Sequence, residues 1–276
     1  MPRVLSTEQI EFFWEHGFCS PIDVMSEDEA LSLKALIETA EKENPQALGP
    51  TNRNNAHLTF TAIDQVAHHP IIVEAVADLL GPDLLLYGSV LFFKEPASAG
   101  YVSWHQDATY MGIAPHHFVT PWLALTPSNA ELGCVRMIPG SHKLGILHHH
   151  DTYGEDNILT RGQNVEDIDD STAVDLILKP GQMSIHHATI VHGSMPNRGT
   201  ERRMGVALQS FMSPECHQTV GDFMVQIAKG CEHWTGDHVF PRPRTDQNPA
   251  DVARREAVNE NWSRILYSGA SQVRAY

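Results

Sequence analysis

The stretch Leu84-Leu85-Leu86-Tyr87-Gly88-Ser89-Val90-Leu91-Phe92-Phe93-Lys94 marks the change from helical to extended sequence in this chain. Later segments are also rich in apolar, β-branched and aromatic residues and are separated by Pro and Gly, and each of them predicts a strand. These further strands are expected at Trp122–Leu125, Val135–Ile138, Asp175–Leu178, Gln182–Val191 and Arg203–Phe211. Many short strands without helical crossovers are typical of an antiparallel sandwich or jelly roll. We therefore predict a mainly β fold with flanking helices.

The sequence on either side of this β-rich part predicts the helices. Two capping boxes, Ser6-x-x-Gln9 and Ser26-x-x-Glu29, each mark a helix start, because the two side chains satisfy backbone N–H groups that the helix leaves free. Proline at the first position and glycine after the last position mark a third helix. The predicted helices run from Ser6 to Gly17, from Ser26 to about Asn44, from Pro70 to Gly81 and over residues 249–259.

Composition places the chain among acidic globular proteins, with 276 residues, 42% of them hydrophobic, and a formal net charge of −15. This charge argues against nucleic acid as a partner, since nucleic-acid affinity depends on Lys and Arg that neutralise phosphates. No run approaches the roughly 18 apolar residues of a membrane helix, and Met1 to Leu5 lack the apolar core of a secretory signal. We expect a cytoplasmic protein whose four cysteines are reduced and mostly buried.

A single domain is predicted over residues 1–276, because no repeat, low-complexity tract or linker interrupts the sequence. Its expected parts are a helical N-terminal part (1–83), a β core (about 84–211) and a C-terminal loop and helix segment (212–276). The segment from His142 to Asp170 and the tail from Glu215 exceed ordinary loop lengths of roughly 12–15 residues, which is typical of functional lids. The sequence carries no signal for an oligomeric state.

Within the β-rich part, Trp104-His105-Gln106-Asp107 places an imidazole and a carboxylate two residues apart. Side chains at i and i+2 of an extended segment project to one face. His192 follows a predicted strand, precedes Gly193-Ser194 and supplies a second imidazole. Two histidines and one carboxylate are the ligand set of non-haem Fe(II) oxygenases, which leaves positions open for a bidentate keto-acid and O2. We therefore predict that His105, Asp107 and His192 bind iron.

A second His-x-Asp pattern, His149-x-Asp151, competes with this assignment. It lies in a run of three histidines between Gly145 and Gly154, without a strand pattern around it. A mobile loop would lose conformational entropy on holding a metal in fixed geometry. We therefore expect His105 and Asp107, and not His149 and Asp151, to be the ligands.

The last predicted strand carries a basic residue on the face that such a site requires. Alternation places Arg203, Gly205, Ala207, Gln209 and Phe211 on one face and Arg202 on the other. A guanidinium holds a carboxylate through two parallel hydrogen bonds and stays charged, so Arg203 is the expected dicarboxylate-binding residue. His186 shares a face with His192 on the preceding strand. For His186, a buried and hydrogen-bonded imidazole is slightly favoured over a residue that lines the site.

These motifs, together with Pro139-Gly140-Ser141-His142, resemble those of the phytanoyl-CoA dioxygenase family. The resemblance runs from about Leu84 to Phe211, and one departure is Leu132-Gly133, where the family usually has Asn-Gly. It implies a double-stranded β-helix, which is a cupin-like jelly roll, and an Fe(II)- and 2-oxoglutarate-dependent oxygenase.

The same resemblance implies the roles of individual residues. His105, Asp107 and His192 would bind iron. Arg203 with Ser194 would hold the far carboxylate of 2-oxoglutarate, and Trp122 would wall the co-substrate pocket, although an aromatic residue at that position fits core packing equally well.

The implied reaction is hydroxylation of an unactivated C–H bond of a small molecule, with 2-oxoglutarate and O2 consumed and succinate and CO2 released. Related halogenases carry Gly or Ala at the position of Asp107, so this carboxylate disfavours halogenation. Desaturation, epoxidation and hydroxylation of a small phosphonate are alternatives on the same site. A non-enzymatic cupin-like ligand binder is a more distant alternative, and the substrate cannot be inferred from the sequence.

Overall fold

The computed structural model describes residues 4–231, 233–236 and 238–273. Within these residues the α-helices are α1 (Thr7–His16), α2 (Glu27–Glu43), α3 (Pro45–Leu48), α4 (Thr61–Ala67), α5 (Pro70–Leu80) and α6 (Pro249–Leu266). Both predicted capping boxes are formed, at Ser6 and at Ser26. The predictions of α1, α2 and α5 are therefore confirmed, whereas α6 is longer than expected and the short helices α3 and α4 were not predicted.

The strands form two larger antiparallel sheets. The large sheet contains β1 (Phe18–Asp23), β2 (Leu84–Leu86), β3 (Val90–Lys94), β6 (Phe118–Ala124), β11 (Gln182–His187), β13 (Arg203–Ala207), β14 (Phe211–Met212), β16 (Met224–Lys229) and β17 (His238–Val239). The small sheet contains β10 (Val174–Asp175), β7 (Val135–Met137), β12 (His192–Ser194) and β4 (Val102–His105). Two further pairs are β5 (Ile113–Ala114) with β15 (His217–Gln218), and β8 (His149–Asp151) with β9 (Gln163–Val165). The pairings are antiparallel except that between β16 and β17, and they confirm the mainly β fold.

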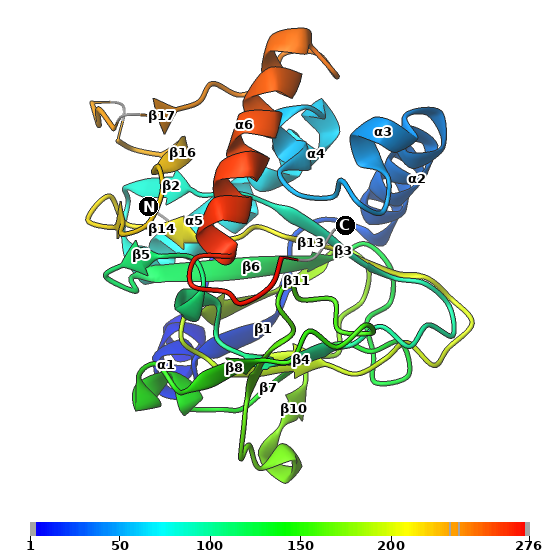
Figure 1. Ribbon diagram of the computed structural model, residues 1–276, viewed down its shortest axis with the longest axis vertical. Helices are drawn as coiled ribbons and strands as arrows, with labels where there is room; N and C mark the ends of the chain where they lie inside the picture. Colours follow the sequence, from blue (N-terminus) through cyan, green and yellow to red (C-terminus); the bar gives the residue numbers. More distant parts are fainter. Residues whose placement is uncertain (1–3, 232, 237, 274–276) are drawn as a thin grey trace.

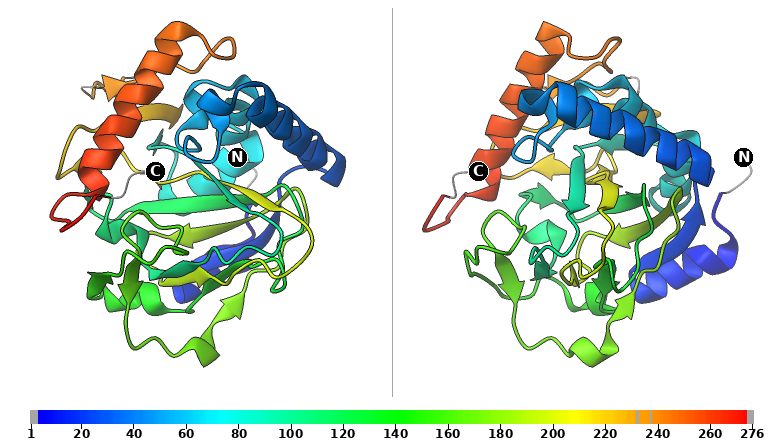
Figure 2. Two further views of the ribbon diagram at one scale, coloured as in Figure 1. Left: turned by 45° about the vertical axis from the view of Figure 1, so that its right-hand side comes forward. Right: turned by 90° about the vertical axis from the view of Figure 1, so that its right-hand side faces the viewer.

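The two sheets face each other, and helices cover the outer side of the large sheet (Figure 1). The views in Figure 2 show α2 to α4 on one side of β6 and the small sheet on the other. The largest apolar cluster lies between helices and large sheet, where Leu33 and Ile72 join Leu91 and Val206. At one end, Trp262 of α6 stacks on Tyr87 with ring centroids 5.2 Å apart. Because this core lies on the helix side of the large sheet, the space between the two sheets is available for a functional site.

Three predicted strands are interrupted in the structure, and each break redirects the chain. The stretch 84–94 splits into β2 and β3 around Gly88. The strand predicted over 182–191 ends at His187 in the large sheet, and the chain re-enters at His192 in the small sheet. The strand predicted over 203–211 is broken at Ser210, whose φ is +63°. The break after His187 moves the chain from the large sheet to the small one, and the other two breaks give the chain new pairing partners within the large sheet. A local sequence pattern does not reveal these changes.

The break at Ser210 overturns the prediction for Phe211. Arg203, Ala207 and Gln209 line one cavity, as alternation predicts. Phe211 instead joins the helix-side core with Val206 and its neighbours. The left-handed backbone at Ser210 reverses the alternation, so Phe211 does not share the face of Arg203.

Two further expectations about local structure were wrong. The N-terminal part was predicted as helical, without a strand, but it contains β1, which pairs with β11 at the edge of the large sheet. His149 was expected in a loop without strand structure, but His149 pairs with Val165 in the β8–β9 ladder. Pairing partners distant in sequence form these strands, and neither has a strong alternating pattern of its own.

The cysteine prediction is confirmed for the described residues. Cys19, Cys134 and Cys216 are buried, Cys231 is half-buried, and none forms a disulfide. Among the helices that the structure describes, none combines the length and apolar character needed to cross a bilayer.

Candidate active site

Three residues that the sequence singled out meet at the end of the small sheet. His105 ends β4, Asp107 begins the 3-10 turn that follows it (Asp107–Thr109), and His192 begins β12. His192 and His105 are paired across neighbouring strands, and their rings lie 4.1 Å apart. One ligand atom from each of the three lies within 4.8 Å of the others, and all three residues are buried. This arrangement can hold one metal ion with two imidazoles and a carboxylate.

The hydrogen bonds of the two histidines leave the same nitrogen free on each. His105 Nδ1 lies 2.9 Å from the Ser103 carbonyl and His192 Nδ1 lies 3.2 Å from the Ile190 carbonyl. Because a carbonyl only accepts, both Nδ1 atoms carry the hydrogen and both Nε2 atoms keep a lone pair. Each Nε2 faces Asp107 Oδ1, at 3.5 Å for His105 and 3.8 Å for His192. These hydrogen bonds to backbone carbonyls fix the tautomer that metal binding requires.

The second oxygen of Asp107 is held by two residues of the large sheet. Thr120 Oγ1 donates to Asp107 Oδ2 at 3.0 Å, and His186 Nε2 lies 3.3 Å from the same oxygen. Burial raises the pKa of Asp107, but His192, His105 and His186 outweigh it and hold that pKa well below its usual range. Burial, with His105 and His186 nearby, lowers the pKa of His192 well below its usual range. The cluster therefore has the anionic carboxylate and neutral imidazole that bind a divalent metal.

Of the two residues that hold Asp107 Oδ2, His186 was considered in the sequence analysis and Thr120 was not. His186 is buried, as favoured, but it also lines the cavity, and its Nδ1 has no hydrogen-bond partner among the described residues. The two interpretations of His186 therefore both apply in part, because its imidazole is buried and hydrogen-bonded to Asp107 through Nε2 and also lines the cavity. Thr120 was not predicted, although it stands two residues from Trp122 on β6, so alternation along that strand could have indicated it.

Arg203 lies on β13 with its side chain almost fully buried, at 2% exposure. Its Nε has no hydrogen-bond partner, and no carboxylate is close enough to offset its charge among the described residues. Burial lowers the pKa of Arg203 to about 10, so the guanidinium stays charged at neutral pH. Arg202 points the other way and pairs with Glu41 and Glu95. The predicted strand parity is therefore correct, and a buried guanidinium without an anion is the group expected to hold a carboxylate ligand.

Trp122 lines the same cavity and packs against Arg203. The Arg203 guanidinium carbon lies 5.0 Å from the Trp122 ring centroid. The indole lies directly over Gly205, where an added Cβ would sit 2.0 Å from Trp122 Cζ2. The missing side chain of Gly205 therefore makes room for the Trp122 indole, which packs against the Arg203 guanidinium.

We predict that Gly205→Ala weakens 2-oxoglutarate binding through this stack. The new methyl group must displace the Trp122 ring, because 2.0 Å is far inside van der Waals contact. Overpacking of this kind costs about 1–3 kcal/mol. We expect a lower melting temperature and a higher Kd for 2-oxoglutarate, measured by calorimetry. Ala207→Gly, on the same face, should leave the indole in place, and an unchanged Kd in Gly205→Ala would contradict the stacking role.

Ser194 is on the cavity wall and is hydrogen-bonded to a buried lysine. Lys94 Nζ donates to Ser194 Oγ at 2.7 Å and also to the Met195 carbonyl. Lys94 is paired with Arg203 across β3 and β13. Burial, together with Arg203, lowers the pKa of Lys94 to about 6. Because Lys94 occupies a lone pair of Ser194, the serine hydroxyl hydrogen is free to donate to a ligand.

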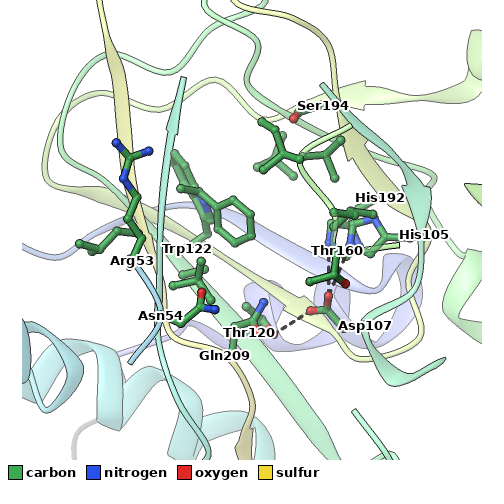
Figure 3. Close-up of a pocket in the computed structure, with 18 of the residues that line it drawn as sticks. Arg53, Asn54, His105, Asp107, Thr120, Trp122, Thr160, His192, Ser194 and Gln209 are labelled. Carbon is green, nitrogen blue, oxygen red and sulfur yellow. Dashed lines mark hydrogen bonds and ion pairs between the residues drawn. The ribbon is translucent and has the colours of Figure 1, made fainter. Parts of the chain in front are cut away.

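One cavity of about 290 Å³ joins these residues (Figure 3). His105, Asp107 and His192 are on one side of it in this view, Trp122 is in the middle and Arg53 is opposite. Ile158, Leu159 and Thr160 add a wall from the long segment predicted to be a lid. Leu266 and Trp262 add another from α6. The volume is near the lower end of the roughly 300–1,000 Å³ of ligand sites.

His149 and Asp151 are engaged with protein partners instead. His149 Nε2 accepts from the Gln106 N–H at 3.0 Å, and Asp151 is paired with Arg161 at 2.6 Å. The part of the chain that the structure describes contains one cluster of metal-ligand side chains, formed by His105, Asp107 and His192. His149 therefore holds the backbone of Gln106, between β4 and the 3-10 turn, and is not a member of the metal-ligand cluster.

Two facing antiparallel sheets with a buried pair of histidines and a carboxylate at one end define the class of non-haem iron oxygenases. The chain belongs to the phytanoyl-CoA dioxygenase family, whose family model matches residues 13–205. The resemblance seen in the sequence is confirmed, and with it the 2-oxoglutarate-dependent dioxygenase class and its Fe(II) and 2-oxoglutarate cofactors.

Individual relatives agree with this family. The chain is 32% identical over 166 residues to a probable alpha-ketoglutarate-dependent hypophosphite dioxygenase of Stutzerimonas stutzeri, covering 59% of this chain and 58% of that relative. It is 24% identical over 252 residues to the peroxisomal phytanoyl-CoA dioxygenase of Rattus norvegicus, covering 83% and 72%.

Solved structures confirm the double-stranded β-helix. The apo form of the non-heme monooxygenase ThoJ superposes with a TM-score of 0.84 at 30% identity, covering 94% of this chain and 98% of that one. CytC3 with Fe(II) and alpha-ketoglutarate superposes with a TM-score of 0.67 at 20% identity, covering 87% and 94%, and shows the shared fold.

Proposed function

We propose that this protein hydroxylates an unactivated C–H bond of a small molecule, using O2 and 2-oxoglutarate and releasing succinate and CO2. The observation that carries this proposal is a single cavity lined by His105, Asp107 and His192 and by the unpaired, buried Arg203. One end of that cavity suits a metal ion and the other suits the far carboxylate of a keto-diacid. A cupin-like ligand binder would not need both.

In this proposal His105 Nε2, His192 Nε2 and Asp107 Oδ1 hold Fe(II). Iron with 2-oxoglutarate and O2 supplies the oxidising power, and the protein supplies positions and shielding. Thr120 and His186 hold Asp107 Oδ2, so that Oδ1 stays turned toward the two histidines. The hydroxyl group takes one oxygen atom of O2 and succinate takes the other, which balances the reaction.

Arg203 and Ser194 hold the far carboxylate of 2-oxoglutarate in the same proposal. The guanidinium donates to it, and Ser194, whose hydroxyl oxygen is occupied by Lys94, also donates. Trp122 walls this subsite and limits the movement of Arg203. Cytoplasmic location stays a prediction from the sequence.

We predict that purified protein with Fe(II) and 2-oxoglutarate forms succinate faster when its substrate is added. The test is a screen of amides, amino acids, acyl conjugates and phosphonates, followed by mass spectrometry under oxygen-18 in chloride buffer. The expected product carries one labelled oxygen atom, because Asp107 occupies the position that chloride would need. A chlorinated product would contradict hydroxylation, a desaturated one would favour that alternative, and absence of succinate with every compound would favour a ligand binder.

A further inference from the structure

The charged side chains that line the cavity either belong to the proposed iron and 2-oxoglutarate sites or are paired with a side chain of opposite charge. Asp107 belongs to the metal cluster, and Arg203 lies with Ser194 at the proposed carboxylate subsite. Arg53 is the remaining cation on the wall. Its guanidinium is paired with Glu41 at 3.0 Å and lies 3.8 Å from Glu95, while its Nε has no hydrogen-bond partner among the described residues. The part of the cavity left for substrate therefore offers no cation without an acidic partner among the described residues.

Neutral polar groups without partners occupy that part instead. Asn54 and Gln209 line the cavity, and within the described residues neither carboxamide forms a hydrogen bond. Trp262 Nε1 is buried without a partner, and so is the Tyr110 hydroxyl. A buried polar group costs stability unless it is satisfied, which applies to the Trp262 and Tyr110 groups. The carboxamides of Asn54 and Gln209 are on half-buried residues that line the cavity, so a ligand there can supply their hydrogen bonds.

The backbone around Asn54 is held by one buried side chain of α6. Arg255, which is 4% exposed, donates to the carbonyls of Asn54, Ala47 and Asn52 at 2.7–2.8 Å. Asn54 also forms a bridge with Val90 of β3, a strand that pairs with β13. This anchoring fixes the position from which the Asn54 carboxamide meets a ligand, as recognition sites require.

The backbone of Gln209 is also held, because its carbonyl accepts from the Gly88 N–H at 3.0 Å next to the turn at Ser210. Val90 pairs with Ala207, two residues before Gln209, so both carboxamides extend one wall of the sheet. In the view of Figure 3 they lie between Arg53 and Asp107. Gln209 and Trp262 also line a smaller adjoining cavity together.

We propose, resting on the proposed oxygenase function, that this cavity selects an uncharged substrate with a carboxamide-type group, bound by Asn54 and Gln209. A carboxamide both donates and accepts, so it can satisfy two carboxamides at once. The apolar part of the substrate lies against Met111, Leu159 and Leu266, which line the same cavity. A phosphonate or another small anion would find no free cation here and would be buried without a counter-charge, which is costly.

Three probes with the same phenylethyl body test this selection: 3-phenylpropanamide, 3-phenylpropanoate and 2-phenylethylphosphonate. Their Kd values are measured by calorimetry without O2, on protein loaded with Fe(II) and 2-oxoglutarate. The amide is expected to bind about tenfold more tightly than either anion, the factor that one well-placed hydrogen-bonding group gives. Asn54→Leu and Gln209→Met should each remove this preference and leave the Kd for 2-oxoglutarate unchanged. The exposed Gln46→Ala serves as the matched control and should keep both values.

Equal or tighter binding of an anion, or no binding of the amide, would overturn the proposal. A preference that survives both substitutions would overturn the roles of Asn54 and Gln209. Because binding is measured without turnover, amide selection without succinate formation would contradict only the proposed function. Turnover of an anion that binds more tightly than the amide would contradict only the selection.

Discussion

Replacing Asp107 by alanine is expected to abolish 2-oxoglutarate turnover and iron binding while the protein stays folded. The carboxylate is the one anionic member of the cluster, and its loss leaves two neutral imidazoles to hold a divalent ion. It also frees Thr120 and His186 from their shared acceptor, Asp107 Oδ2. Iron content after desalting and succinate formation measure the effect.

The neighbouring residues provide the comparison for this prediction. His105→Ala and His192→Ala should lose activity in the same way, because each removes one ligand atom from the cluster. His149→Ala should retain iron and most activity, since the partners of His149 are the Gln106 N–H, the Leu147 carbonyl and the Thr109 hydroxyl, none of which belongs to the cluster. Full activity in any of the first three variants would remove that residue from the site.

Replacing Arg203 by alanine is expected to raise the Kd for 2-oxoglutarate by orders of magnitude and to leave iron binding nearly unchanged. A buried carboxylate would lose its charge partner, which costs about 2–5 kcal/mol. At 1.4 kcal/mol per factor of ten, this is roughly 30-fold to several thousandfold in Kd. Titration calorimetry of the iron-loaded protein without O2 measures it.

Arg202→Ala is the matched control, because Arg202 is the adjacent arginine and faces outward to Glu41 and Glu95. It should lower stability slightly and leave the Kd for 2-oxoglutarate unchanged. A defect in Arg202→Ala with normal binding in Arg203→Ala would show that the strand parity is assigned wrongly.

The parts of the site that could be predicted from sequence depend on local geometry. The spacing of His105 and Asp107 and the parity that separates Arg203 from Arg202 follow from extended backbone alone. The same rule failed at Phe211, because the left-handed residue Ser210 breaks the alternation.

Other parts depend on contacts between segments far apart in the chain. Lys94 reaches Ser194 across 100 positions, and Arg255 anchors Asn54 across 201. Neither contact has a local sequence signal, since each arises from strand pairing or helix packing. The cavity wall that selects a substrate is therefore visible only in the folded protein.

The most direct test of the central claim is the visible absorption that arises when 2-oxoglutarate chelates protein-bound Fe(II) in the absence of O2. We predict that the band appears with one iron per chain in the wild-type protein. It should be lost in Asp107→Ala, and in Arg203→Ala it should require a much higher 2-oxoglutarate concentration. A folded wild-type protein that takes up Fe(II) and 2-oxoglutarate without this band, or an Asp107→Ala variant that shows it unchanged, would contradict the account.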